Sequence, residues 1–240
     1  MARPVRKQAA ASGPDAPPAG LFVTFEGGEG AGKSTQIRLL EQALKKRGFP
    51  VLVTREPGGS PGAEAVRHVL LSGAAEPLGP EAEAMLFAAA RADHVDTIIR
   101  PALHKGVHVL CDRFYDSTRV YQGSSGKVPA ALIDRLEAVA CGDCRPDLTI
   151  IIDVEPAEGL RRAAARRATG AAPDRFEKEA IALQEKRRGL YRDIARREPD
   201  RCAIVDGMEG ESALHEEILS LVLQRLAARG TAGRGPVARP

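Results

Sequence analysis

Short runs of apolar residues alternate along this chain with longer stretches of helical periodicity. The runs lie at 21–26, 50–54, 107–111, 147–153 and 202–206, and most are continuous rather than alternating in polarity. Continuous apolar runs are typical of strands that are buried on both faces. Because helical patterns separate them, the strands are predicted to be parallel, with right-handed crossovers. We therefore predict an α/β fold and expect ligands at the carboxyl ends of its strands.

Three regions after the second strand have a helical pattern of apolar or charged residues. Leu78 to Leu103 has the pattern of one long helix, and about 210–228 that of an amphipathic helix that packs on the sheet. Leu160 to Arg175 is rich in arginine and is interrupted by Thr169-Gly-Ala-Ala-Pro173, which predicts a helix end, a loop and a new helix. An arginine run is usually a solvated face, but the interruption favours a mobile lid whose arginines could close over phosphates.

A glycine-rich motif typical of phosphate-binding loops lies between the first predicted strand and the first predicted helix. Gly27 to Ser34 fits G-x-x-x-x-G-K-[ST], and a helical pattern from Thr35 to Lys46 follows it. In this context the glycine backbone directs N–H groups at anionic oxygens, and the helix N-terminus adds partial positive charge. Lys33 can reach the β- and γ-phosphates of a nucleotide, and the Ser34 hydroxyl can bind Mg²⁺. The predicted ATP-binding residues are Gly27, Gly28, Glu29, Gly30, Ala31, Gly32, Lys33, Ser34 and Thr35.

Length and charge indicate one domain between two tails. The 240 residues are 43% hydrophobic, which suffices for a substantial core. Residues 1–19 and 230–240 each carry a net charge of +2, so the formal charge of +3 leaves −1 for residues 20–229. Nucleic-acid-binding domains usually concentrate positive charge on the folded body, so we expect no nucleic-acid partner. The composition of both ends predicts disordered tails around a domain at 20–229.

Other compositional features exclude further classes. No apolar segment follows the first basic residues, and no run approaches the length that spans a membrane. We therefore expect a cytoplasmic protein without a membrane partner. Four cysteines are too few and too scattered for a disulfide framework. Cys141 and Cys144 form a C-x-x-C without a second pair or suitably spaced histidines, which favours incidental cysteines near a helix end.

Charged residues stand where the second and third strands are predicted to end. Arg55 could bind a phosphate there, although a solvated salt bridge with Glu56 fits the spacing equally well. Asp112 ends a buried strand, as a carboxylate that holds Mg²⁺ or its water shell would. Arg113 beside it suggests that metal and phosphate meet here. Hydrogen-bonding side chains follow on the next helical turns, either for a ligand or for a capped helix start: Ser117, Thr118, Tyr121 and Gln122.

Phe87 and Arg91 share one face of the long predicted helix, because they are four residues apart. A ring beside a guanidinium can stack on a nucleobase and hydrogen-bond its edge. Periodicity alone favours a core phenylalanine with a surface arginine. His94 could join the same face, but a lone helical histidine is usually just accommodated, and we assign it no role.

The phosphate-binding loop alone admits several classes of nucleotide-binding protein. The chain contains no asparagine, so it lacks the Asn-Lys-x-Asp element with which GTPases read guanine. Motor ATPases usually end the Walker B strand in Asp-Glu, whereas this strand ends in Asp112-Arg113. A small α/β chain with an arginine-rich lid fits a kinase of small metabolites. A phosphate-bearing acceptor is itself the nucleophile, so catalysis then needs mainly alignment and charge neutralisation.

A family resemblance covers roughly residues 20–228. Its motifs are Phe25-Glu-Gly-Gly-Glu-Gly-Ala-Gly-Lys-Ser-Thr-Gln36, Thr54-Arg-Glu-Pro-Gly-Gly59, Leu86-Phe-Ala-Ala-Ala-Arg91, Asp112-Arg113, Tyr121-Gln-Gly123 and Arg145-Pro-Asp-Leu-Thr149. In this order they resemble the thymidylate kinase family. The resemblance implies a P-loop nucleoside monophosphate kinase fold with five parallel strands. It also implies Mg²⁺-dependent transfer from ATP to dTMP, giving dTDP for dTTP synthesis, and a homodimer.

The resemblance also implies which residues bind the nucleoside of dTMP. By motif matching, Phe87 would stack on thymine and Arg91 would bond the edge of the base. Thr118 and Gln122 would also face the base, and Tyr121 would face the deoxyribose.

Arg55 and Arg113 would hold the dTMP phosphate, and Glu29 matches a family carboxylate near the sugar and the metal-linked phosphate. The P-loop contains no arginine, which resembles the bacterial form whose catalytic arginine comes from the lid. Lys33, Arg113, Glu29 and Arg166 are thus the expected catalytic residues, with Ser34 and Asp112 at the metal. The lid, at about 162–176, is longer than the commonest pattern, so the choice stays open among Arg162, Arg166, Arg167 and Arg175.

Two alternatives remain at this point. The acceptor could be another nucleoside monophosphate or a nucleoside. The chain could also be a nucleotide-binding regulatory module that has lost catalysis, although the intact Lys33, Ser34 and Asp112 argue against this.

Overall fold

The computed structural model describes residues 19–124, 128–167 and 181–232. Most of both predicted tails and the lid from residue 168 onward lie outside the described residues. The last helix continues to Ala232, three residues beyond the predicted end of the domain at 229. Within the described residues, no helix combines the length and the apolar character needed to cross a membrane.

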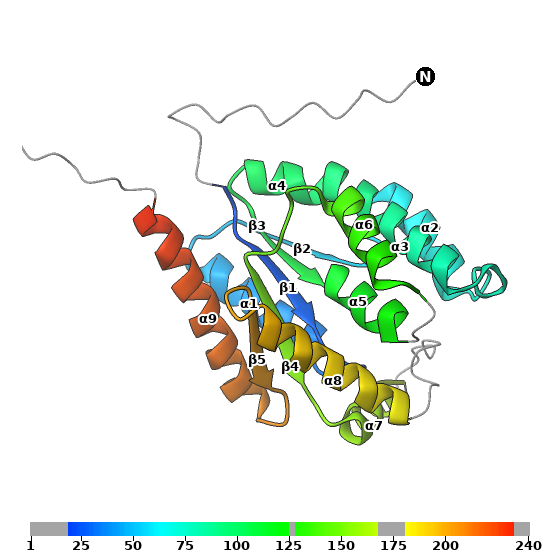
Figure 1. The fold of residues 1–240 in the computed structure, drawn as a ribbon. Coiled ribbons are helices and arrows are strands. Elements are labelled where there is room, and N and C mark those ends of the chain that lie inside the picture. The colour runs from blue at the N-terminus through cyan, green and yellow to red at the C-terminus, as the bar shows by residue number, and fades with distance from the viewer. Residues whose placement is uncertain (1–18, 125–127, 168–180, 233–240) are drawn as a thin grey trace, which may run out of the picture.

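Five parallel strands form one sheet in the order β2-β3-β1-β4-β5 (Figure 1). The strands are β1 (Phe22–Glu26), β2 (Val51–Arg55), β3 (His108–Asp112), β4 (Leu148–Asp153) and β5 (Cys202–Asp206). Each predicted strand is confirmed to within one residue at either end. The central strand β1 is buried throughout, and β4 is buried except at its last residue, as their continuous apolar sequences predict.

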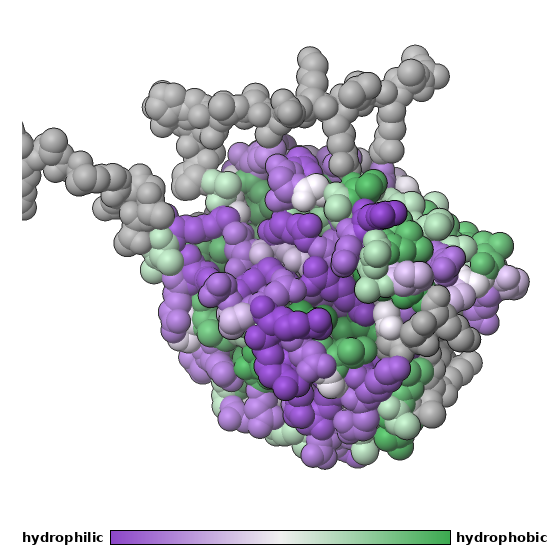
Figure 2. All heavy atoms as spheres, viewed as in Figure 1, coloured by the Kyte–Doolittle hydropathy of each residue, from purple (hydrophilic) through white to green (hydrophobic). Residues whose placement is uncertain are grey.

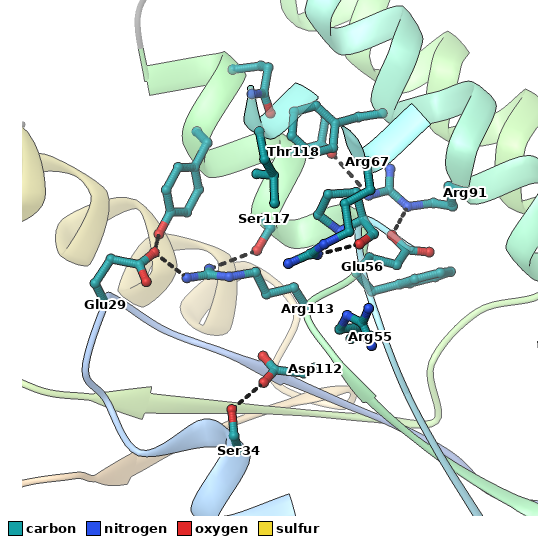
Figure 3. Close-up of a pocket in the computed structure, with 16 residues that line it drawn as sticks. Glu29, Ser34, Arg55, Glu56, Arg67, Arg91, Asp112, Arg113, Ser117 and Thr118 are labelled. Atoms are coloured by element: carbon teal, nitrogen blue, oxygen red, sulfur yellow. Dashed lines mark hydrogen bonds and ion pairs between the residues drawn. The ribbon is translucent and has the colours of Figure 1, made fainter. Parts of the chain in front are cut away.

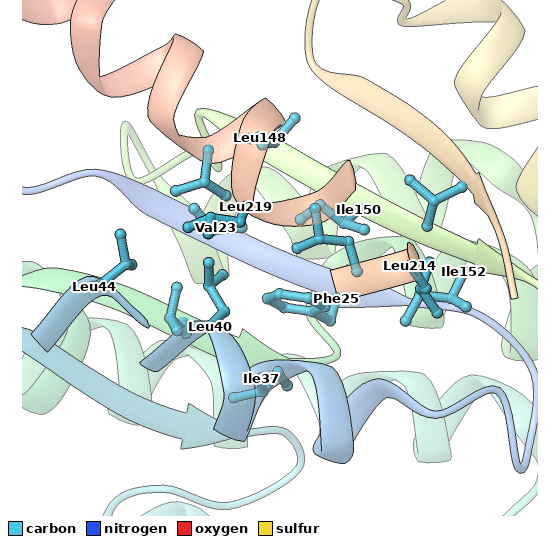
Figure 4. Close-up of a cluster of buried hydrophobic side chains, with 14 of the residues drawn as sticks. Val23, Phe25, Ile37, Leu40, Leu44, Leu148, Ile150, Ile152, Leu214 and Leu219 are labelled. Atoms are coloured by element: carbon cyan, nitrogen blue, oxygen red, sulfur yellow. The ribbon is translucent and has the colours of Figure 1, made fainter. Parts of the chain in front are cut away.

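Helices cover both faces of the sheet. The other elements are α1 (Lys33–Lys46), α2 (Pro61–Leu71), η1 (Glu76–Leu78), α3 (Pro80–His94), η2 (Val95–Ile99), α4 (Arg100–His104), α5 (Tyr115–Ser124), α6 (Ala130–Cys141), α7 (Pro156–Arg167), α8 (Ile181–Arg197) and α9 (Glu211–Ala232). One face packs on α1 and α9, where Phe25 of β1 meets Leu40 and Leu214 (Figure 4). On the opposite face, Phe22 packs with residues of α3, α5 and α6. The predicted packing of the last helix on the sheet is confirmed.

The long helix predicted over 78–103 is present but divided. A 3₁₀ turn and Gly79, which has a φ of +84°, precede α3, and Pro80 begins that helix. Between α3 and α4 the backbone widens into the π-helical segment η2. Pro101 in the next turn lacks an N–H and cannot make the regular helical hydrogen bond, which accounts for a departure from α-geometry at this place.

The four cysteines are buried and free, and Cys141 is the last residue of α6. The helix end that the sequence predicts at these cysteines is confirmed.

Candidate active site

The phosphate-binding loop connects β1 to α1 at the carboxyl edge of the sheet. Gly27, Gly30 and Gly32 have φ values of +134°, +69° and +94°, which glycine adopts without the steric cost of a side chain. A Cβ atom on Gly30 would lie 1.9 Å from the carbonyl oxygen of Gly159, so only glycine fits where the loop passes α7. In the described chain no side chain caps the N-terminus of α1, which leaves its first N–H groups for an anion.

Lys33 lies beneath this loop and is 8% exposed. Its Nζ donates hydrogen bonds to the carbonyl oxygens of Gly27 (3.2 Å) and Gly28 (3.0 Å). Burial, and then the nearby Arg113, lower the pKa of Lys33. The ammonium group is therefore held at the loop by weak acceptors that a phosphate oxygen could replace.

Ser34 and Asp112 meet where α1 begins and β3 ends (Figure 3). The Ser34 hydroxyl donates to Asp112 Oδ2 over 2.8 Å. Oxygen atoms of this kind are ligands that Mg²⁺ accepts, together with phosphate oxygens and water. The described residues contain no group of three or more histidine, cysteine or acidic side chains that could hold a metal by themselves. A metal ion at this place would therefore depend on oxygens of a bound nucleotide.

Arg113 links the end of β3 to the phosphate-binding loop. Its backbone has a φ of +67°, which is uncommon for a residue with a side chain and often marks a functional site. Nη2 forms an ion pair of 2.5 Å with Glu29, and Nη1 donates to the carbonyl oxygen of Gly27 and to Ser117 Oγ, both over 3.2 Å. The guanidinium carbon lies 5.0 Å from the centre of the Tyr121 ring. These contacts aim the guanidinium across the site (Figure 3).

A cavity of about 260 Å³ opens beside Arg113. Its wall contains every residue predicted to bind the acceptor: Arg55, Phe87, Arg91, Arg113, Thr118, Tyr121 and Gln122. Glu29, Ser34 and Asp112 also line it, so the phosphate-binding loop and the metal candidates border the same space. The structure thus brings together residues that lie almost one hundred positions apart in the sequence.

Arg55 pairs with Glu64 over 2.8 Å, and both side chains are about half exposed. The alternative pairing of Arg55 with Glu56 is wrong, because Glu56 turns inward to Arg91. An exposed ion pair contributes little to stability, so Arg55 can exchange its partner for a phosphate at low cost. Arg67 of α2 also lines the cavity, and sequence reasoning missed it because it follows no strand end.

Arg91 is 3% exposed, so the alternative of a surface arginine is wrong. Its Nε donates to Glu56 Oε2 over 2.7 Å and its Nη2 donates to Thr118 Oγ1 over 3.1 Å. Phe87, one turn earlier on α3, is only partly buried and presents its ring to the cavity. A planar ring and a fixed hydrogen-bond donor therefore stand next to each other.

On α5, Tyr121 and Gln122 are held by acidic partners. The Tyr121 hydroxyl donates to Glu29 Oε1 over 3.0 Å, and Gln122 Nε2 donates to Glu83 Oε1 over 2.7 Å. Burial raises the pKa of Tyr121 above its ordinary value, so its hydroxyl stays protonated as a donor.

Sequence reasoning missed Glu26, the last residue of β1, which is fully buried. It accepts hydrogen bonds from the Phe114 N–H (2.8 Å), the Ser117 hydroxyl (2.6 Å) and the Tyr191 hydroxyl (3.0 Å). Burial, and then the neighbouring Asp116 carboxylate, raise the pKa of Glu26 to about 7. An acid at the end of a buried strand, directly before the glycine-rich loop, was the available signal.

A second cavity, of about 330 Å³, borders the other part of the loop. It is lined by Gly30, Ala31, Gly32, Thr35, Gln36, Arg162, Gly207, Glu209, Glu211 and Leu214. Sequence reasoning missed the residues after β5, although the rule that ligands gather beyond strand ends applies to that strand too.

Of the predicted lid arginines, the structure places the side chain of Arg162 only. It donates to Glu158 Oε1 (2.6 Å) and to the carbonyl oxygen of Gly207 (2.9 Å), at the second cavity rather than the first. Arg166 and Arg167 end α7, but their side chains lie outside the described part of the structure, as does Arg175.

Comparisons with known proteins agree on one family. Residues 25–218 match the family model described as thymidylate kinase. A thymidylate kinase of Afipia carboxidovorans is 56% identical over 212 residues, which are 88% of this chain and 92% of that protein. One of Nitrobacter winogradskyi is 58% identical over 187 residues, 78% of this chain and 81% of that protein. The crystal structure of thymidylate kinase from Ehrlichia chaffeensis matches with a TM-score of 0.67 and 33% identity, covering 85% of this chain and 100% of that chain.

Proposed function

The chain belongs to the thymidylate kinase family, and we propose that its two cavities hold dTMP and ATP beside the P-loop for this family's reaction, transfer of the γ-phosphoryl group to dTMP. One observation carries the assignment of residues. A single cavity collects an aromatic ring, a buried arginine, two further arginines at strand ends, and the Ser34–Asp112 pair of the P-loop edge.

The cavity beside Arg113, here called the acceptor cavity, offers partners for the base, the sugar and the phosphate of dTMP. Phe87 is proposed to stack on thymine, and Arg91 to donate to a carbonyl oxygen at the edge of the base. Thr118 and Gln122 stand beside the same edge, with Tyr121 toward the sugar. Arg55 and Arg113 enter from the ends of β2 and β3, where two guanidinium groups can bind a phosphate dianion.

On the donor side, the P-loop is proposed to bind the β- and γ-phosphates of ATP through its N–H groups. Lys33 would exchange the carbonyl oxygens of Gly27 and Gly28 for phosphate oxygens. The second cavity, beyond Gly30 to Gly32, would take the rest of the nucleotide.

Ser34 and Asp112 are proposed to hold Mg²⁺ or its water shell. Members of this family generally require a divalent metal, and Mg²⁺ is the ion that fits two oxygen donors next to phosphates. When bound, it would neutralise charge on the β- and γ-phosphates.

The acceptor phosphate is itself the nucleophile, so the reaction needs no strong general base. Catalysis then consists of aligning two anionic groups and neutralising their charge. Lys33 and Arg113, which both donate to the carbonyl oxygen of Gly27, are proposed to do this, and Glu29 to aim Arg113 through its ion pair. A lid arginine, best matched by Arg166, is proposed to add charge in the transition state.

The choice of acceptor is tested by ADP release with dTMP, dUMP, dCMP, dGMP and thymidine as alternative acceptors. The proposal expects the highest kcat/KM with dTMP. A strong preference for another acceptor would contradict it, and ATP binding without dTMP-dependent ADP release would indicate a module that has lost catalysis.

For the assembly we propose a homodimer. Large apolar side chains are exposed on adjacent elements at one end of the molecule: Val69 (37%), Leu78 (63%), Met85 (49%) and Val139 (67%). They belong to α2, η1, α3 and α6, which pack on one another, and Figure 2 shows hydrophobic residues over this region. Light scattering of wild type and Val139→Glu checks this proposal, with a dimer mass expected only for the wild type. A cytoplasmic location and the absence of a nucleic-acid partner stay predictions.

A further inference from the structure

Arg91 is held in one orientation by two side chains, Glu56 and Thr118, which line the acceptor cavity with it. Glu56 binds its Nε over 2.7 Å and Thr118 binds its Nη2 over 3.1 Å. The guanidinium carbon also lies 5.3 Å from the centre of the Phe114 ring. Within the described residues, the third nitrogen of the Arg91 guanidinium, Nη1, makes no hydrogen bond. Arg91 also lines the acceptor cavity. The guanidinium group is thus fixed through Nε and Nη2, and Nη1 remains as a hydrogen-bond donor.

Glu56 is locked in its turn by His94. The Glu56 side chain is 4% exposed, and its second oxygen, Oε1, lies 3.2 Å from His94 Nδ1. A carboxylate that contacts a guanidinium with one oxygen and an imidazole with the other has little freedom to rotate. Because both side chains are buried, neither contact is weakened by competition from water.

His94 is fully buried and is fixed at its far nitrogen as well. Nε2 lies 2.7 Å from the hydroxyl of Thr54, near the end of β2. A neutral ring satisfies both contacts when Nδ1–H donates to Glu56 and Nε2 accepts from Thr54. The packing is tight, since a Cβ atom on Gly59 would lie 2.4 Å from both His94 Nε2 and Thr54 Oγ1.

These side chains form a continuous buried path from β2 through α3 to α5. We propose that Glu56 and His94 are positioning residues that set base selectivity, by holding Arg91 as a hydrogen-bond donor toward the edge of the acceptor's base. The inference rests on the proposed function. A guanidinium can donate but cannot accept, so a fixed Arg91 favours a base with a carbonyl oxygen at that edge and rejects one with an amino group.

A matched pair of acceptors tests this role. At the base edge, dTMP has a carbonyl oxygen and an N3–H donor, whereas 5-methyl-dCMP has an amino group and an unprotonated N3, and the two nucleotides are otherwise the same. The readout is the ratio of their kcat/KM values, which does not depend on how much of a variant is folded. Wild type is expected to prefer dTMP strongly. In His94→Leu and in Glu56→Gln the ratio is expected to fall at least about tenfold, mainly through a higher KM for dTMP.

Three further variants sharpen the result. His94→Asn keeps a donor at the position of Nδ1 and should retain a ratio near that of the wild type. Thr54→Val removes one hydroxyl group with little change in volume and should lower the ratio by a few fold. It therefore tests the role of His94 if His94→Leu does not fold. His108→Leu removes a histidine at the opposite end of β3 and should leave the ratio unchanged.

The inference would be overturned if the ratio were unchanged in Glu56→Gln and also in His94→Leu, or in Thr54→Val should His94→Leu not fold. It would also be overturned if the ratio fell equally in His108→Leu. A wild type that phosphorylates neither nucleotide would instead contradict the proposed function.

Discussion

Glu26 provides the sharpest test of the electrostatics of the site. Burial and the neighbouring Asp116 raise the pKa of this carboxyl group from 4.5 to about 7. A raised pKa means that the folded protein keeps a proton that the unfolded chain has already released. The free energy of unfolding should therefore fall as the pH rises from 5 to 8, and linkage gives about 2 to 3 kcal/mol for this one group.

Glu26→Gln removes the titrating group while keeping its shape. The difference in unfolding free energy between variant and wild type should therefore shift in favour of the variant by about 2 to 3 kcal/mol between pH 5 and pH 8. Urea denaturation of both proteins at each pH measures it. Activity should fall in the same variant, because an amide puts an NH2 donor in place of one of the oxygens that accept hydrogen bonds from the Phe114 N–H and from the Ser117 and Tyr191 hydroxyl groups.

Glu64→Gln is the matched control. The N–H of Gly59 lowers the pKa of Glu64, so this carboxylate stabilises the fold above its unfolded pKa and loses that effect as the pH falls. Because it is ionised in both the folded and the unfolded chain above about pH 5, the difference in unfolding free energy between Glu64→Gln and wild type should stay nearly constant between pH 5 and pH 8. If the difference between Glu26→Gln and wild type is the same at pH 5 and pH 8, Glu26 has an ordinary pKa and the reasoning is refuted.

Three other substitutions test individual roles. Lys33→Ala should lower kcat by about 10³-fold or more, measured by ADP release at saturating substrates, because Lys33 is proposed to support the transferring phosphoryl group. Phe87→Ala should mainly raise the KM for dTMP, because stacking is lost in ground and transition states alike; an unchanged dTMP affinity would count against base stacking. Asp112→Asn should raise the Mg²⁺ concentration needed for half-maximal rate, and a metal titration with the same midpoint as wild type would remove Asp112 from the metal site.

The strands and the P-loop could be predicted from the sequence, because both depend on local patterns of residues. Apolar runs and the glycine-rich loop fixed the strands and the P-loop, because strand burial and loop conformation follow from neighbouring residues. The rule that ligands gather at strand ends placed Arg55, Asp112 and Arg113 together. Motif resemblance added Phe87 and Arg91, and the structure brings all of them to one cavity.

Pairings between distant side chains were not predictable in this way. Glu56 turns to Arg91 rather than to its neighbour Arg55, and Glu26 binds Ser117, which lies 91 residues later. Such pairings depend on how helices dock on the sheet, and neither periodicity nor spacing contains that information. His94, which sequence reasoning treated as merely accommodated, is buried between two polar partners for the same reason.

The central claim is that this chain moves a phosphoryl group from ATP to dTMP. ATP labelled in its γ-phosphate, incubated with the protein, Mg²⁺ and dTMP, tests it most directly when the products are separated. The account predicts label in the β-phosphate of dTDP, formed in proportion to ADP. Label that stays in ATP, or that appears only as inorganic phosphate, would contradict it.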